Sequence, residues 1–124
     1  MKKKKKQKFS TWLVDQAIQR RRSLNEDLRR KMLERISESL NKLSMSIRFE
    51  KAYIFGSVAK KGQFREGSDV DIGFVGLEPE NEIRTVAMLS DLLGIDVDVV
   101  LLEGHRLAQK IMRGILWKKP KRKF

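Results

Sequence analysis

Apolar residues recur at every third or fourth position between residues 24 and 47. This spacing puts them on one side of a helix, so the pattern predicts an α-helix with one buried face. Ser23 is followed three residues later by Glu26, a capping-box pattern that predicts the start of this helix at Ser23. The residues of the apolar stripe are Leu24, Leu28, Met32, Ile36, Leu40, Leu43 and Ile47.

A shorter helix is predicted upstream, because four apolar residues have helical spacing and three arginines, residues 20–22, follow them. Cations suit the C-terminal end of a helix, where they meet the negative end of its dipole. We therefore divide the chain into a basic N-terminal extension with a short helix (1–22), a core (23–117) and a basic C-terminal tail (118–124). The four apolar residues are Phe9, Trp12, Leu13 and Ala17.

Further along the chain, several short segments alternate apolar and polar residues, as half-buried β-strands do. Pro79 suits the first turn of a helix after the second of these segments, and Gly94 suits its end. Apolar residues between Leu107 and Met112 predict one more helix. The order of elements predicts an α/β (α+β) fold, in which a small mixed sheet carries helices on its apolar face. The predicted strands are residues 50–55, 69–75, 95–102 and 115–117.

Two acids, Asp69 and Asp71, share the other face of the second predicted strand, because side chains alternate along a strand. Two unit charges about 4 Å apart repel by roughly 4 kcal/mol at an effective dielectric near 20. A divalent cation removes that cost, and Mg²⁺ favours carboxylates together with phosphate oxygens. The third strand carries Asp96 and Asp98 on one face, so strand pairing could add a metal ligand or a general base. The alternative is a solvated pair of acids on an edge strand.

The turn between the first two strands begins with Gly56 and Ser57 and contains three cations, Lys60, Lys61 and Arg65. Glycine lets a phosphate approach the backbone closely. A short helix after Gly56 would direct its N-terminal amides at an anion, although Ser57 has the alternative role of a plain helix cap. The P-loop pattern of glycines followed by Lys-Ser or Lys-Thr is absent. The turn is therefore predicted to hold phosphate by another route.

Three pieces of sequence in this order carry a resemblance to a known family. They are Gly56-Ser57, the run from Arg65 to Ile72 that contains Asp-Val-Asp, and Val97-Asp98-Val99-Val100. Together they resemble the minimal nucleotidyltransferases of the DNA polymerase beta superfamily, over roughly residues 23–117. Eleven residues separate Gly-Ser from Asp-x-Asp here, one more than is usual in the related antitoxins.

The resemblance implies the polymerase beta-like nucleotidyltransferase fold and an Mg²⁺-dependent enzyme that transfers AMP from ATP to an acceptor hydroxyl. Two Mg²⁺ ions would be held by carboxylates, as in other two-metal sites. The implied acceptor is a tyrosine of a cognate HEPN-type toxin, with this protein as the antitoxin. The implied catalytic and metal-binding residues are Asp69, Asp71 and Asp98, and the implied nucleotide-binding residues are Gly56, Ser57, Lys60, Lys61, Arg65 and Ser68.

The net charge of +12 lies almost entirely at the two ends of the chain. Residues 1–8 contain six lysines and residues 118–124 contain five basic residues, with no acid in either segment, which leaves +1 for residues 9–117. Such tails either aid solubility as solvated, disordered segments or hold RNA, DNA or an acidic partner electrostatically. No aromatic residue lies among the tail lysines, so base stacking is not indicated.

Two other functions fit the same residues. One is a non-catalytic module that binds a toxin or RNA, and the other is nucleotidyl transfer to an RNA 3′ end. The chain contains no cysteine, which excludes disulfides and thiolate metal sites. It also contains no apolar run long enough to span a membrane. These features favour a cytoplasmic protein without a membrane partner.

Overall fold

The N-terminal third of the chain forms one uninterrupted helix. The computed structural model describes the backbone of residues 2–119 and the side chains of residues 11–119, and helix α1 covers Lys2–Ser46, 45 residues. The predicted helix start at Ser23, and with it the separate short helix in the extension, is therefore wrong. No glycine or proline precedes Gly56, so nothing in this segment breaks a helix. Glu26 does not cap a helix. Its carboxylate forms an ion pair with the Arg29 guanidinium, one turn later, at 2.7 Å.

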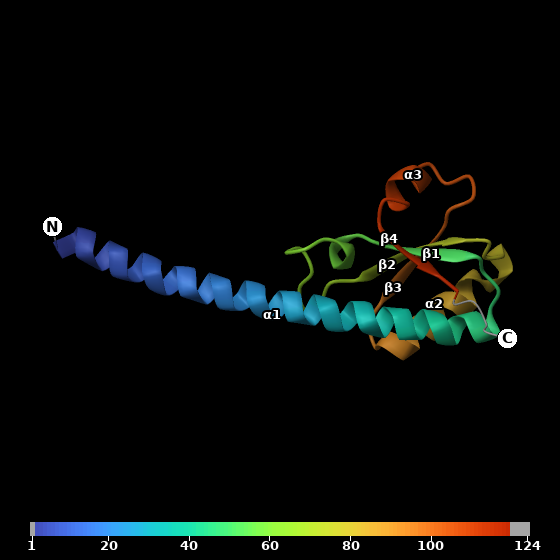
Figure 1. Cartoon of the computed structure of the whole chain (residues 1–124), viewed down its shortest axis with the longest axis horizontal. Helices are drawn as coiled ribbons and strands as arrows, with labels where there is room; N and C mark the ends of the chain where they lie inside the picture. Colours follow the sequence, from blue (N-terminus) through green and yellow to red (C-terminus); the bar gives the residue numbers. More distant parts are fainter. Residues whose placement is uncertain (1, 120–124) are drawn as a thin grey trace.

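The C-terminal half of α1 packs on the rest of the molecule, whereas its N-terminal half projects beyond it as an arm (Figure 1). The predicted stripe is confirmed from Met32 onward, because Met32, Ile36, Leu40, Leu43 and Ile47 are buried. Leu28 packs partly against this core, and Leu24 is 69% exposed. The point where α1 leaves the body therefore lies close to Leu28.

The four strands form one mixed sheet in the order β3-β2-β1-β4. Strand β1 pairs with β2 and β4 in antiparallel fashion, and β2 pairs with β3 in parallel fashion. The parallel pair is joined by the short 3-10 helix η2 (Pro79–Asn81) and by α2 (Glu82–Leu93). The strands are β1 (Lys51–Phe55), β2 (Val70–Val75), β3 (Val97–Leu101) and β4 (Ile115–Lys118). Each predicted strand is thus present, and no end is shifted by more than two residues.

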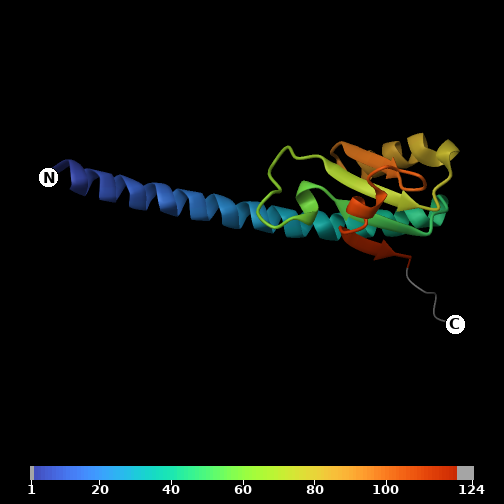
Figure 2. The same cartoon turned by 90° about the horizontal axis from the view of Figure 1, so that it is seen from above.

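The two faces of the sheet are covered differently (Figures 1 and 2). Helices α1 and α2 cover one face, where Ile54, Ile72 and Phe74 belong to the main core. The short helix α3 (Ala108–Ile111) lies over the other face, where a second cluster joins Ile111 to Tyr53 and Leu102. The predicted small mixed sheet is confirmed, with α1 and α2 on its apolar face as expected, whereas α3 lies on the opposite face.

Most of the predicted C-terminal tail, residues 120–124, lies outside the described residues, and Lys118 belongs to β4. Among the helices of residues 2–119, none combines the length and the apolar character that a bilayer crossing requires.

Candidate active site

Strand pairing brings two acids together on the face of the sheet that α1 and α2 leave uncovered. The parallel register places Asp71 of β2 directly opposite Asp98 of β3, and neighbouring strands are about 4.8 Å apart. The residues flanking Asp71, Val70 and Ile72, are fully buried on the opposite face. Of the two acids that the sequence offers on the third strand, the register therefore selects Asp98 as the neighbour of Asp71.

The surroundings of Asp71 disfavour its charged form. Burial, a hydrogen bond with the Asp98 side chain and the negative charges of Asp98 and Asp69 together raise the pKa of Asp71 from 3.8 to about 6. Asp69 lies just before β2 and is exposed. It is therefore close enough to act on Asp71 electrostatically, although only Asp98 shares a hydrogen bond with it. Both ion pairs among the described residues lie elsewhere, on α1, so the carboxylate pair suits a bound cation.

The raised pKa of Asp71 predicts how the stability of the metal-free protein depends on pH. In the unfolded chain this carboxyl ionises near 3.8, whereas in the folded protein it ionises near 6. Its contribution to stability is therefore full below about pH 3.8 and is lost as the pH rises through about 6. Asp71→Asn should remove this loss. Denaturant titrations from about pH 4 to pH 8, without divalent cations, should show the variant gaining stability over the wild type as the pH rises. A difference that stays constant with pH would contradict the raised pKa.

The end of β1 lies directly against this acid pair. Phe55 is opposite Asp71 in the antiparallel register, and the next residue, Gly56, has a positive φ of 75° with ψ of −153°. A Cβ atom at Gly56 would overlap the Asp71 carboxylate oxygen Oδ2. Only glycine satisfies both the backbone conformation and the close approach. The Gly-Ser turn and the first acid motif therefore form one site.

Substitution of Gly56 can be tested against a matched glycine. Gly62 also has a positive φ, 82°, but nothing lies within 4 Å of a Cβ atom built there. Gly56→Ala and Gly62→Ala should each cost about 1–3 kcal/mol of stability through backbone strain. Gly56→Ala should in addition displace the Asp71 carboxylate, and a misplacement of about 1 Å can slow catalysis by about 10²-fold. Equal transfer rates in the two variants would show that contact with Asp71 has no part in the reaction.

After Gly56 the chain makes one 3-10 turn, η1 (Ser57–Ala59), so the short helix predicted after Gly56 is a single 3-10 turn. Gly56 occupies its N-cap position without a side-chain cap, so a capping role for Ser57 is wrong. Arg29 of α1 holds the end of the turn, because its Nε donates a hydrogen bond to the Val58 carbonyl oxygen at 2.9 Å. Sequence patterns gave no signal for this contact, which joins residues that are 29 positions apart.

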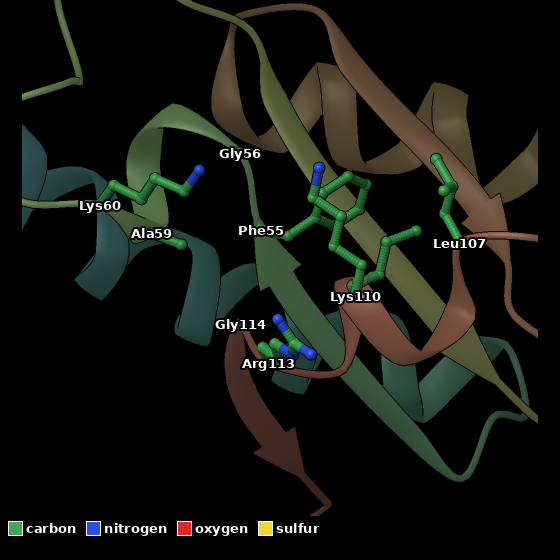
Figure 3. A pocket seen from close by; sticks show the side chains of 9 residues that line it. Phe55, Gly56, Ala59, Lys60, Leu107, Lys110, Arg113 and Gly114 are labelled. Carbon is green, nitrogen blue, oxygen red and sulfur yellow. The ribbon is translucent and has the colours of Figure 1, made fainter.

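A cavity of about 490 Å³ opens beside Gly56, between η1 and α3 (Figure 3). Of the four predicted nucleotide-binding side chains beyond Ser57, only Lys60 lines it. The two other cations in its lining, Lys110 and Arg113, were not expected from the sequence. The available signal was their helical spacing just before Gly114, which indicates that both project from one end of a helix.

The other predicted nucleotide-binding residues do not line this cavity; they are Ser57, Lys61, Arg65 and Ser68. Ser68 instead forms hydrogen bonds with the backbone of Arg65, three residues earlier in the same loop. Its Oγ accepts a hydrogen bond from the Arg65 backbone N–H at 3.0 Å, and its N–H donates to the Arg65 carbonyl oxygen, also at 3.0 Å. Lys61 and Arg65 are exposed on this loop. Their contacts with nucleotide stay predictions.

The residue types fit a divalent cation only in part. Asp71 and Asp98 supply two carboxylates, and the charge of Asp98 contributes to the raised pKa of Asp71. Hard cations prefer such oxygen ligands. Among the described residues, however, no group of three or more acidic, histidine or cysteine side chains is close enough to form a metal site. The carboxylate pair is thus formed, and the role of Asp69 as a third ligand stays a prediction.

Known proteins with similar sequence or structure include nucleotidyltransferases. A protein-family model described as polymerase beta, nucleotidyltransferase, matches residues 34–121. One solved structure, of a protein proposed to be a minimal nucleotidyltransferase, is 28% identical with a TM-score of 0.54, and the match covers 69% of this chain and 91% of that chain. A protein from Sulfolobus solfataricus, proposed to be a nucleotidyltransferase, is 32% identical with a TM-score of 0.50 and coverage of 73% and 83%. No curated protein matches the chain significantly.

Proposed function

Because the chain belongs to the polymerase beta nucleotidyltransferase family, we propose that it transfers a nucleoside monophosphate, AMP from ATP, to an acceptor hydroxyl group. The observation that carries this proposal is the placement of Asp71 opposite Asp98, with the Gly56 backbone against the Asp71 carboxylate. A phosphate held at the Gly56 turn would lie next to two acids. This is the combination that nucleotidyl transfer requires.

In the proposed reaction the acceptor oxygen attacks the α-phosphorus of ATP and forms a new O–P bond. The bond from that phosphorus to the bridging oxygen breaks, and pyrophosphate leaves. Asp98 takes the proton of the acceptor hydroxyl, as a general base must lie within hydrogen-bond reach of the proton that it removes. Mg²⁺ bound by the acids would supply charge neutralisation for the carboxylates and for the phosphate oxygens. Gly56 positions the phosphate by admitting it to the backbone.

The position of Asp98 favours a large acceptor. Strand β3 is an edge strand of the sheet, and Asp98 is exposed on it. Within residues 2–119 the acid pair is therefore open on the β3 side to a macromolecule that presents a hydroxyl group. We propose a tyrosine of a HEPN-type partner toxin as that acceptor, which would make the protein an antitoxin. The resemblance to minimal nucleotidyltransferases supports this choice.

The acceptor can be identified by incubating the protein and Mg²⁺ with labelled ATP and either a candidate toxin or RNA. We expect label on the toxin, with loss of labelling when its acceptor tyrosine is changed to phenylalanine. Label on RNA alone would replace the tyrosine with a nucleic-acid hydroxyl. Binding of the toxin without any label would mean that the protein acts by contact alone.

The basic arm of α1 favours RNA as the second candidate acceptor. The six lysines of residues 2–8 belong to helix α1 rather than to an irregular tail, and the N-terminal half of α1 projects from the body (Figure 1). A phosphate backbone binds a lysine-rich segment electrostatically and releases counterions.

Removal of residues 2–8 should leave transfer to a small-molecule hydroxyl unchanged, because these residues lie outside the matched domain. RNA binding should weaken, and the slope of its affinity against salt concentration should fall, since fewer phosphates are neutralised. Salt titrations of RNA binding with the full-length and shortened chains provide the measurement. An unchanged slope would show that these lysines do not contact RNA.

A further inference from the structure

The lining of the cavity beside Gly56 combines three cations with apolar side chains. Its basic lining residues, Lys60, Lys110 and Arg113, come from two separate segments of the chain. Figure 3 shows the amino groups of Lys60 and Lys110 directed toward the space near Gly56, with the Arg113 guanidinium across from them. No acid belongs to the lining. The complete lining is Phe55, Gly56, Ala59, Lys60, Leu107, Lys110, Ile111, Arg113 and Gly114.

These three cations have no counter-charge within the described residues. Both ion pairs there lie within α1, where Arg29 pairs with Glu26 and Arg30 pairs with Asp27. Across residues 11–119, the side chains of Lys60, Lys110 and Arg113 make no hydrogen bond to protein atoms. Three like charges around one cavity repel one another, and a bound anion offsets this repulsion by attracting all three. The cavity volume is also within the usual range for small-molecule sites.

The cavity continues the row of functional residues across the sheet. Asp98, Asp71 and Phe55 are opposite one another on β3, β2 and β1, so the first and last are about 10 Å apart at the usual strand spacing. Gly114 brings the end of α3 onto β1, because a Cβ atom there would overlap the Ile54 carbonyl oxygen. The acids therefore lie on β3 and β2, and the cavity with its cations adjoins Phe55 on β1.

We propose that this cavity holds the β- and γ-phosphates of the nucleoside triphosphate, and that Lys110 and Arg113 of the α3 segment give the site its preference for triphosphates. This inference rests on the proposed nucleotidyl transfer. It assigns the cavity lined by Lys60, Lys110 and Arg113, called the cation cavity below, to the nucleotide substrate of that reaction. Phosphate oxygens are acceptors only, and lysine and arginine side chains are donors only. A nucleobase fits the lining less well, because the polar side chains there offer its amino group no acceptor. The α-phosphate would remain at Gly56, next to the acids.

Nucleotide binding without transfer tests this assignment. We would measure the affinities of ATP, ADP, AMP and inorganic tripolyphosphate for the wild type and for the Lys110→Ala/Arg113→Ala variant. Hydrogen bonds to charged groups are strong enough for the variant to lose about tenfold or more in affinity for ATP and tripolyphosphate. AMP affinity should change less than about twofold. The matched control is Lys42→Ala/Arg84→Ala, which removes two exposed cations outside the cavity and should bind all four ligands normally.

A thermal melt and one further variant guard against an indirect effect. Lys110 and Arg113 are exposed, so the fold should survive, and a thermal melt checks this. The charge-preserving variant Lys110→Arg/Arg113→Lys should recover most of the lost ATP affinity, which a purely structural role would not predict. Failure of this rescue, with wild-type melting in both variants, would overturn the phosphate contact.

The remaining outcomes separate this inference from the proposed function. Wild-type ATP affinity in the Lys110→Ala/Arg113→Ala variant, with transfer intact in the wild type, would overturn only the cavity assignment. The wild type could instead fail to bind ATP and tripolyphosphate but bind a single-stranded oligonucleotide through Lys110 and Arg113. That result would assign these cations to the phosphates of a nucleic acid and overturn the inference. A wild type that binds none of these ligands would overturn both proposals.

Discussion

Asp71→Asn should abolish nucleotidyl transfer and leave the fold intact. The substitution keeps the size and shape of the side chain but removes the charge that lies beside Gly56 and opposite Asp98. Folding does not depend on that charge, because the surroundings of Asp71 raise its pKa to about 6 and so oppose its ionisation. The protein therefore gives up stability at neutral pH to keep an ionised carboxylate at this position, which is typical of a functional site.

The control for this variant is Asp91→Asn. Asp91 is exposed on α2, and α2 covers the face of the sheet opposite the acid pair. Transfer should be undetectable for Asp71→Asn and unchanged for Asp91→Asn, with both melting at or above the wild-type temperature. Near wild-type labelling by Asp71→Asn would place the reaction at another site.

Asp98→Asn should lower turnover by about 10²–10⁴-fold, the usual contribution of a general base. ATP affinity should fall far less, because the phosphates would be held by Gly56 and by the cation cavity rather than by Asp98. The exposed position of Asp98 on edge strand β3 is consistent with a group that meets the incoming acceptor. Single-turnover rates and equilibrium ATP binding separate the two effects.

Asp96 provides the matched control for Asp98. It is exposed and lies two residues earlier, just before β3, and its carbonyl oxygen accepts a hydrogen bond from the Val70 N–H at 3.2 Å. That bond involves only the backbone, so Asp96→Asn should preserve both the sheet and the reaction. Normal turnover in Asp98→Asn together with loss in Asp96→Asn would assign the base to Asp96 and contradict the role given to the register.

The sheet and its acid pair were predictable from the sequence because each depends on local alternation. Asp71 and Asp98 each lie between apolar residues that must enter the core, and this fixes the face on which each acid lies. The ordered motifs then implied that the two strands are neighbours. The long buried stripe of α1 was predictable for the same reason, since Met32, Ile36 and Leu40 recur at the period of a helix.

The continuity of α1 could not be predicted from the same local patterns. Ser23 and Glu26 have the spacing of a capping box, but this spacing also occurs inside helices. In the structure, Glu26 pairs with Arg29, which then holds the turn after Gly56. A sequence pattern does not distinguish these two uses of one glutamate.

The cation cavity was missed because its parts meet only in the folded chain. Lys60 follows η1, whereas Lys110 and Arg113 belong to the α3 segment about fifty residues later. They approach each other because Gly114 allows α3 to lie on β1 and because Ile111 packs with Tyr53 and Leu102. Neither contact has a signature within a short window of sequence.

We propose above that the site formed by the Asp71–Asp98 pair beside Gly56 transfers a nucleotidyl group. The most direct test of this claim offers the wild type and Asp71→Asn, with Mg²⁺ and the candidate acceptor, ATP labelled either at the α-phosphate or at the γ-phosphate. We predict that the wild type attaches the α-label to the acceptor, that the γ-label appears only in released pyrophosphate, and that Asp71→Asn attaches neither. Attachment of the γ-label, or equal attachment of the α-label by both proteins, would contradict the claim.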